Sequence, residues 1–273
     1  MPSTPAKRPS TRPATAPQDG EARLRSQVNL SDRAYERIEE LLICCELKPG
    51  RFLATHELQA MVGFGRTPVL QAVNRLAAET LLLVTPRHGV QIAPIDLTRE
   101  RLLLDLRRDM ERFVIRLATQ RSGSSQRNQM MHIKRHLVEH GAGMRIDQFN
   151  VVDRRIDQLF LAAANEPFVE STLRPLHTIF RRIGWIYHMR TDRHADLQGT
   201  VDGHIRVIDA VASGDVDAAI QASDGLMDFV EGMFKVLERE VSPAVLDCSL
   251  DAYDASLFPA PAPAEDTHDT ATS

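Results

Sequence analysis

The segment Gly65-Arg66-Thr67-Pro68-Val69 places side chains that can form hydrogen bonds at the beginning of an expected helix. An Arg side chain can donate two parallel hydrogen bonds to a guanine, and a Thr hydroxyl at a helix N-terminus suits a phosphate oxygen. Pro68 fits the first helical position, where a missing N–H costs nothing, so Thr67 is expected to cap the helix. These residue types together predict a helix whose exposed start contacts DNA.

A two-stranded hairpin is expected directly after this helix. Leu82–Thr85 and Val90–Ala93 are the predicted strands, and Arg87-His88-Gly89 is the turn between them. A helix followed by a hairpin with a basic tip is typical of the second half of a winged helix-turn-helix, whose helix enters the major groove. Arg87 and His88 are therefore expected to contact phosphates or the minor groove.

Two further helices are expected upstream, one capped by Ser31 and ending at Pro49-Gly50, and a short one from Thr55 to Gly63. His56 begins the short helix and is a candidate phosphate ligand, while Gln71 lies one turn into the DNA-facing helix and could bind adenine. The predicted DNA-contacting residues are Arg66, Thr67, Gln71, His56, Arg87 and His88.

Composition indicates a cytoplasmic protein with two modest domains. The chain has 273 residues, 43% of them apolar and 26% charged, and no long uncharged apolar run that would predict a membrane span. Two of the three cysteines, Cys44 and Cys45, are adjacent, which is typical of reduced thiols and not of a disulfide framework. Residues 1–94 carry 12 Lys and Arg against 9 Asp and Glu, so the front of the chain is mildly basic.

Amphipathic periodicity from Leu97 onward predicts an all-α bundle of about six helices, so the fold class is mainly α. The expected organisation is a winged helix over 29–95 and the bundle over 97–241. Pro, Ser, Thr and charged residues dominate 1–28 and 242–273, which are expected to be a disordered basic tail and a second disordered tail.

The front of the chain resembles the DNA-binding domain of GntR-family regulators. The resemblance rests on Pro49-Gly50-Arg51-Phe52-Leu53, Glu57-Leu58, the segment from Gly65 to Val69, and Leu76 to Leu81. Four positions depart from the family pattern: Gly65 replaces a usual Ser, Leu70 an Arg, Gln71 a Glu and Thr80 a Gly. The resemblance implies a homodimeric transcription regulator, more often a repressor, on an inverted-repeat operator in double-stranded DNA. Because Leu70 stands where the family usually has an Arg, the resemblance also implies that this chain binds a half-site different from the family's usual one.

The remainder is similar to the FCD-type all-helical effector domain of one branch of that family. Arg108 to Glu111, Asp153 to Asn165, and His204 to Gly214-Asp215 carry this similarity. It implies a cavity that holds a small organic acid or a metal. Arginine is the natural partner of a carboxylate, so the predicted effector-binding residues are Arg108, His177 and Arg181.

Asp153, Asp157 and His204 are the candidate metal ligands. FCD domains commonly use one Asp and three His, and here Asp157 and Leu226 stand where two of those His would lie. Two carboxylates four residues apart on a helix need a cation between them, either an Arg or a divalent ion such as Zn, Ni or Mn. A structural metal site and a metal-dependent hydrolase or lyase are the alternatives. Because no nucleophile motif accompanies these residues, a regulator is expected and not an enzyme.

Overall fold

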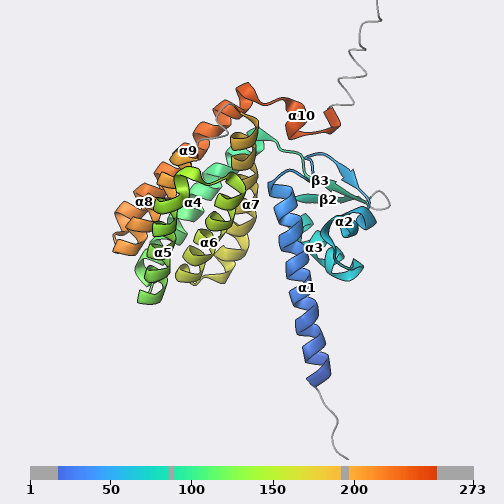
Figure 1. The fold of residues 1–273 in the computed structure, drawn as a ribbon, viewed down its shortest axis with the longest axis horizontal. Coiled ribbons are helices and arrows are strands. Elements are labelled where there is room, and N and C mark those ends of the chain that lie inside the picture. Colours follow the sequence, from blue (N-terminus) through green and yellow to red (C-terminus); the bar gives the residue numbers. More distant parts are fainter. Residues whose placement is uncertain (1–17, 86–88, 192–196, 251–273) are drawn as a thin grey trace, which may run out of the picture.

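The structure is a computed structural model that describes residues 18–85, 89–191 and 197–250. Arg87 and His88, which are predicted to contact DNA, lie outside the described residues. A helical bundle and a smaller winged-helix domain lie side by side, and helix α1 runs next to helix α7 along their boundary (Figure 1).

The winged-helix domain consists of α1 (Gln18–Ile43), α2 (Thr55–Val62), α3 (Arg66–Ala78) and a small sheet. The sheet pairs β1 (Phe52–Leu53), β3 (Gly89–Ile92) and β2 (Leu82–Thr85) in antiparallel order. The sequence predicted the two strands of the wing but missed β1, which has only two residues. Gly89 permits this pairing because a Cβ there would lie 2.4 Å from the Leu53 carbonyl oxygen.

Helix boundaries in the winged-helix domain differ from the sequence predictions. Helix α1 ends at Ile43, before the predicted stop at Pro49-Gly50. Helix α1 begins at Gln18, so Ser31 lies inside it, and the predicted disordered tail over 1–28 is wrong from residue 18 onward. Gly65, not Thr67, is the N-cap of α3, which places Arg66 and Thr67 in its first turn. Ala54 precedes α2, and the Glu57 side chain accepts a hydrogen bond from the Ala54 amide at 2.7 Å.

The second domain confirms the predicted bundle of six long helices. They are α4 (Leu97–Arg121), α5 (Ser124–His140), α6 (Ile146–Ala164), α7 (Pro167–Arg190), α8 (Gln198–Ser213) and α9 (Val216–Glu240). A short 3-10 turn, Gly141–Gly143, joins α5 to α6. Asp96 and Asp215 cap α4 and α9 with side-chain oxygens that accept backbone N–H groups of the first turn.

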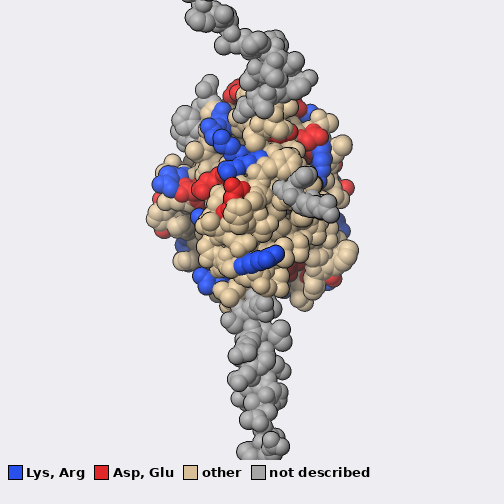
Figure 2. Space-filling view, turned by 90° about the vertical axis from the view of Figure 1, so that its right-hand side faces the viewer, with Lys and Arg blue, Asp and Glu red and all other residues tan. Residues whose placement is uncertain are grey.

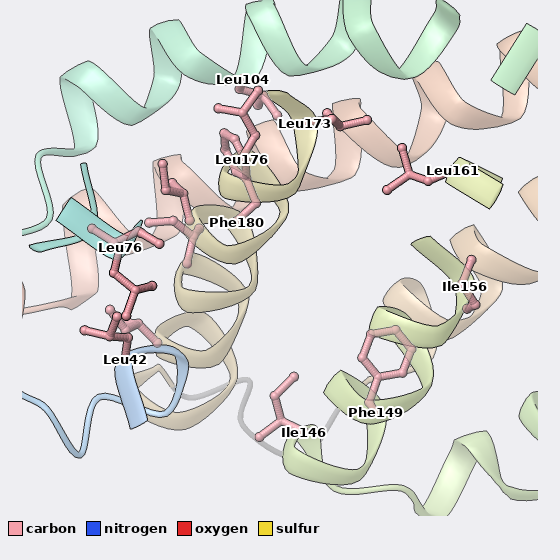
Figure 3. Close-up of a cluster of buried hydrophobic side chains, with 14 of the residues drawn as sticks. Leu42, Leu76, Leu104, Ile146, Phe149, Ile156, Leu161, Leu173, Leu176 and Phe180 are labelled. Atoms are coloured by element: carbon pink, nitrogen blue, oxygen red, sulfur yellow. The ribbon is translucent and has the colours of Figure 1, made fainter. Parts of the chain in front are cut away.

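Buried aliphatic and aromatic side chains on the inner faces of the helices form the core of each domain. In the bundle, Leu104 of α4 and Leu176 and Phe180 of α7 belong to this core, and Figure 3 labels them. Leu42 and Leu76 belong to the winged-helix core and are also fully buried. Because α7 packs against α4, α6 and α9, its polar residues His177, Arg181 and Arg182 are buried inside the bundle.

The segment after α9 packs against the winged-helix domain, although a disordered tail was predicted from 242. Helix α10 (Pro243–Leu246) ends where the Leu246 carbonyl accepts the Ile95 amide at 2.8 Å. The Cys248 amide donates to the Pro49 carbonyl at 2.9 Å. Gly50 is required at this contact, since its φ is +79° and a Cβ there would lie 2.0 Å from Asp247 Oδ1.

Candidate DNA-binding surface and effector cavity

Helix α3 separates an apolar underside from an exposed face of different chemistry. The underside consists of Val69, Ala72, Val73 and Leu76, all buried. Arg66, Thr67, Leu70 and Gln71 point away from the core and are exposed. The helical period therefore presents the predicted residues to solvent, while packing beneath them fixes the direction of the helix.

Two of the predicted DNA contacts on α3 are unengaged, and a third is partly engaged. Within the described part of the chain, the side chains of Arg66 and Thr67 make no hydrogen bond or ion pair, and exposed His56 of α2 makes none either. Gln71 differs, since its amide oxygen accepts a hydrogen bond from Ser31 of α1. The face of the molecule at the right of Figure 1 is mostly uncharged, with Lys and Arg in separate groups (Figure 2).

Inside the bundle, Arg181 of α7 lies between the two carboxylates of α6. Its Nε donates to Asp153 Oδ2 at 2.6 Å, and its Nη2 donates to Asp157. Arg181 and Asp153 are each 8% exposed, so the ion pair is shielded from water. Of the two partners that the sequence allowed for this Asp pair, the structure contains the arginine.

His204 of α8 extends this network through Asp153. Its Nε2 lies 2.8 Å from Asp153 Oδ1, and its Nδ1 lies 2.7 Å from the Thr200 carbonyl oxygen. Both ring nitrogens therefore face acceptors, which favours the imidazolium form. Burial alone would lower the pKa of His204, but the hydrogen bond and charge of Asp153 raise it.

His177 of α7 connects the network to α4. Its Nδ1 lies 3.0 Å from Asp157 Oδ2 and its Nε2 lies 2.9 Å from Glu111 Oε1. Arg107, one turn before Glu111, donates its Nε to the same carboxylate at 3.1 Å. We call these seven residues the charge cluster: Arg107, Glu111, Asp153, Asp157, His177, Arg181 and His204.

Burial and neighbouring charges together shift the pKa values of the three carboxylates in the charge cluster. Burial opposes ionisation of Glu111, but His177 and Arg107 lower its pKa to about 2. Burial also opposes ionisation of Asp153, and there Arg181 and His204 hold the pKa below its ordinary value. At Asp157 burial outweighs the attraction of His177 and Arg181, so its pKa is raised. The environment therefore favours the ionised form of Glu111 and Asp153 and disfavours that of Asp157.

A cavity of about 50 Å³ lies against the charge cluster. Its polar lining includes Arg107, Asp153, His177, Arg181 and His204, with Phe149, Phe180 and Leu226 among the apolar lining. The structure therefore brings two predicted effector residues, His177 and Arg181, to one cavity. Leu226, which the FCD resemblance places at the position of a usual His, also lines it.

Arg108, the third predicted effector residue, lies elsewhere. Its Nη1 lies 2.7 Å from Asp228 and its Nη2 lies 3.6 Å from Glu231, both on α9, and it is not part of the cavity lining. The preceding residue, Arg107, lines the cavity instead. Arg107 lies four residues before Glu111 on one helix face, a spacing that could have identified it from the sequence.

The predicted metal ligands do not fit an ion as a set of three. Arg181 takes the position between Asp153 and Asp157 that an ion would need, and His204 contacts Asp153 of that pair through Nε2. A different group, Glu111, Asp157 and His177, has ligand atoms that all lie within 4.8 Å of one another.

None of the helices in the described part of the chain has the length and apolar character needed to cross a membrane.

Comparison with known families confirms the assignment of both domains. Residues 30–92 match the model of bacterial regulatory proteins of the gntR family, and residues 102–229 match the FCD domain. This chain is a GntR-family regulator with an FCD domain. A DNA-binding transcriptional regulator is thereby supported, and the alternative of a metal-dependent enzyme is not, because the family consists of regulators.

Relatives of this GntR regulator match over different lengths. The Escherichia coli transcriptional repressor RspR is 23% identical over 225 residues, covering 81% of this chain and 96% of that protein. A transcriptional regulator in an unstable DNA locus of Streptomyces ambofaciens is 35% identical over 65 residues, which is 28% of that protein.

Solved structures support the fold. E. coli McbR/YncC matches with a TM-score of 0.66 at 17% identity, covering 76% of this chain and 97% of that one. A putative GntR regulator from Rhodococcus sp. RHA1 matches with a TM-score of 0.55 at 17% identity, covering 77% and 98%. These similarities confirm a winged helix followed by an all-α domain.

Proposed function

We propose that this GntR regulator is a homodimeric cytoplasmic repressor that binds an inverted-repeat operator and releases it when a small organic acid enters the cavity. The DNA-binding part rests on the unengaged side chains of Arg66 and Thr67 at the start of α3. Arg66 suits the O6 and N7 acceptors of guanine, and Thr67 suits a phosphate. Exposed Leu70 replaces an Arg with an apolar group, which suits a thymine methyl.

Exposed apolar residues on α4 support the homodimer. Leu102, Leu106 and Phe113 are 68%, 50% and 45% exposed. Their spacings of four and seven residues place them on one face of the helix, where a second copy would bury them about a two-fold axis. Two DNA-binding domains related by this axis would match an inverted repeat.

Light scattering tests the dimer. We expect the Leu106→Glu variant to be monomeric and to bind operator DNA weakly, because a charge in the paired face opposes burial. Val138→Glu on α5 is the matched control, since Val138 is 63% exposed on another helix. A dimeric Leu106→Glu variant would contradict the use of this face.

The effector proposal rests on the position of Arg107 at the cavity. It is 9% exposed and lines the cavity, and its Cζ lies 5.1 Å from the centre of the Phe180 ring. Its Nε bonds to Glu111, while its two terminal nitrogens make no hydrogen bond within the described residues. A guanidinium with two free donors on one edge binds a carboxylate in bidentate fashion. The small cavity favours a small acid.

Thermal-shift screening of organic acids, followed by DNA-release titrations, tests this effector class. We expect at least one acid to raise the melting temperature and weaken DNA binding. Arg107→Met should abolish both responses, and Arg108→Met, the adjacent control outside the cavity, should keep both. The proposal fails if no acid stabilises the protein, or if the two variants respond equally.

A divalent metal is the second candidate ligand, favoured by the convergence of Glu111, Asp157 and His177. One nitrogen and two carboxylate groups suit Mn, Ni or Zn. Metal analysis of the purified protein, with DNA binding measured before and after chelator, decides this candidate. Bound metal that is lost in His177→Gln would support it, and metal-free protein with unchanged DNA binding would reject it.

A further inference from the structure

Tyr35 of α1 connects the two domains through its aromatic ring. The ring is buried, and the side chain is 1% exposed. The Cζ of Arg75, from recognition helix α3, lies 4.0 Å from the ring centre, and the Cζ of Arg174, from α7 of the effector domain, lies 4.9 Å from it. A cation over a desolvated ring is attracted by the ring quadrupole. Tyr35 therefore contacts one arginine from each domain.

Polar contacts fix the C-terminal end of α3 on this ring. The Tyr35 hydroxyl donates to Glu79 at 2.6 Å, and Arg75 Nε lies 3.3 Å from the same carboxylate group. Arg75 also reaches Asp32 of α1 at 3.4 Å. The direction of α3, and therefore of Arg66 at its other end, depends on where α1 holds Arg75 and Glu79.

One helical turn further along both helices, a second contact repeats the pattern. Glu39 follows Tyr35 by four residues, and Thr178 follows Arg174 by four. Glu39 is 2% exposed and accepts a hydrogen bond from Thr178 Oγ1. Arg154 of α6 completes the contact, with Nη2 3.1 Å from Glu39. Breaking a buried, hydrogen-bonded ion pair leaves a charge uncompensated, so this contact resists separation of the domains.

Helix α7 also contacts the segment that links β3 to α4, and it contributes residues to the charge cluster. Arg182 Nη1 donates to the Ala93 carbonyl, between β3 and α4, at 2.9 Å. The neighbouring Arg181 binds Asp153 and Asp157 beside the cavity. Helix α7 therefore carries residues that line the cavity and residues that contact the DNA-binding domain.

We propose that Arg174 and Glu39 are positioning residues for the recognition helix: without touching DNA, they hold α1 against α7, and through Tyr35 they fix the orientation of α3. This inference goes beyond the proposed function, because it needs neither the effector nor the metal. It predicts that sequence-specific binding depends on a contact at the domain boundary. Binding through phosphates alone does not need a fixed helix orientation.

Arg174 variants of the full chain test the proposal. The DNA probes are a duplex enriched by the unmodified protein from a random-sequence library and an unselected duplex. We expect Arg174→Ala to weaken binding to the selected duplex about three- to tenfold and to leave the unselected duplex within about twofold. Arg174→Lys, which keeps a cation over the ring, should restore binding. Arg155→Ala is the matched control, since Arg155 is exposed and its side chain bonds, among the described residues, only to Gln129.

Backbone amide exchange in α3 provides the second readout, because it detects loss of order without DNA. Exchange should accelerate in Arg174→Ala and in Glu39→Gln, and stay unchanged in Arg155→Ala and in Glu40→Gln. Glu40 is exposed, and its carboxylate pairs within the described segments only with Arg37. The Arg174 pair carries the test if Glu39→Gln does not fold.

The proposal is overturned if Arg174→Ala binds the selected duplex and exchanges α3 amides like the unmodified protein. Failure of the proposed function looks different, because the unmodified protein would then enrich no duplex. In that case the exchange measurement alone supports or overturns the positioning role.

Discussion

The exposed face of α3 and the charge cluster of the bundle use similar side chains in opposite ways. Arg66 and Thr67 are exposed and unengaged within the described chain. Arg181 is buried, with a carboxylate on either side. A polar group without a partner is stable on the surface, where water solvates it, whereas a buried charge is stable only when paired.

This difference indicates how each region meets its ligand. DNA can bind α3 without disrupting internal contacts, so residues there should affect affinity and leave stability unchanged. A ligand of the cavity must fit among charges that already balance one another, so residues there should affect stability first.

Arg181→Met should lower the free energy of unfolding by about 3–5 kcal/mol, because it leaves Asp153 and Asp157 buried without their cation. Denaturant titration measures this change. Arg155→Met on the solvent side of α6 is the control and should change stability by less than about 0.5 kcal/mol. Equal stability of the two variants would show that the buried ion pairs contribute little.

Arg66→Ala should leave the free energy of unfolding within about 0.5 kcal/mol of the unmodified protein, because the side chain is exposed and unpaired. Its discrimination between selected and unselected duplexes should fall by about 1–3 kcal/mol, the contribution of a bidentate guanine contact. Fluorescence anisotropy with both duplexes measures this loss. Undiminished discrimination would remove Arg66 from the base-contacting set.

Glu100 in the first turn of α4 provides a buried carboxylate that is not part of the charge cluster. Burial raises its pKa to about 8 from an ordinary value of 4.5, although the charge of Arg182 opposes the shift. The folded state therefore binds a proton that the unfolded state releases, and stability is lost as pH rises through this window. Relative to Glu100→Gln, the unmodified protein should lose about 2 kcal/mol between about pH 5.5 and about pH 7.

Unfolding titrations of both proteins across that range check the prediction. Asp105→Asn, at an exposed position of the same helix, is the control and should parallel the unmodified protein. A pH dependence that Glu100→Gln shares in full would assign the effect to other groups.

Periodicity and local turn chemistry predicted much of the fold. The strands of the wing, the exposed start of α3 and the six bundle helices follow from the spacing of apolar residues within each segment, and this spacing does not depend on how the segments pack. The resemblance to the GntR family predicted the order of the two domains. Exposure of Arg66 and Thr67 followed even though Gly65, and not Thr67, caps the helix.

Contacts between segments far apart in the sequence could not be predicted from residue spacing. The sequence offered an Arg or a metal as partner for Asp153 and Asp157, and only the packing of α6 on α7 places Arg181 between them. A shift of one residue along α4 exchanges Arg108 for Arg107 in the cavity, since neighbouring residues lie about 100° apart on a helix. The ordered segment after α9 rests on backbone hydrogen bonds to Ile95 and Pro49, which side-chain composition does not encode.

The most direct test of the central claim, that paired α3 helices recognise a specific DNA sequence, is selection of random-sequence duplexes by the full unmodified chain. We expect enrichment of an inverted repeat whose half-sites contain a guanine and are no longer preferred by the Arg66→Ala variant. Enrichment of no sequence, or of one that Arg66→Ala selects equally well, would contradict it.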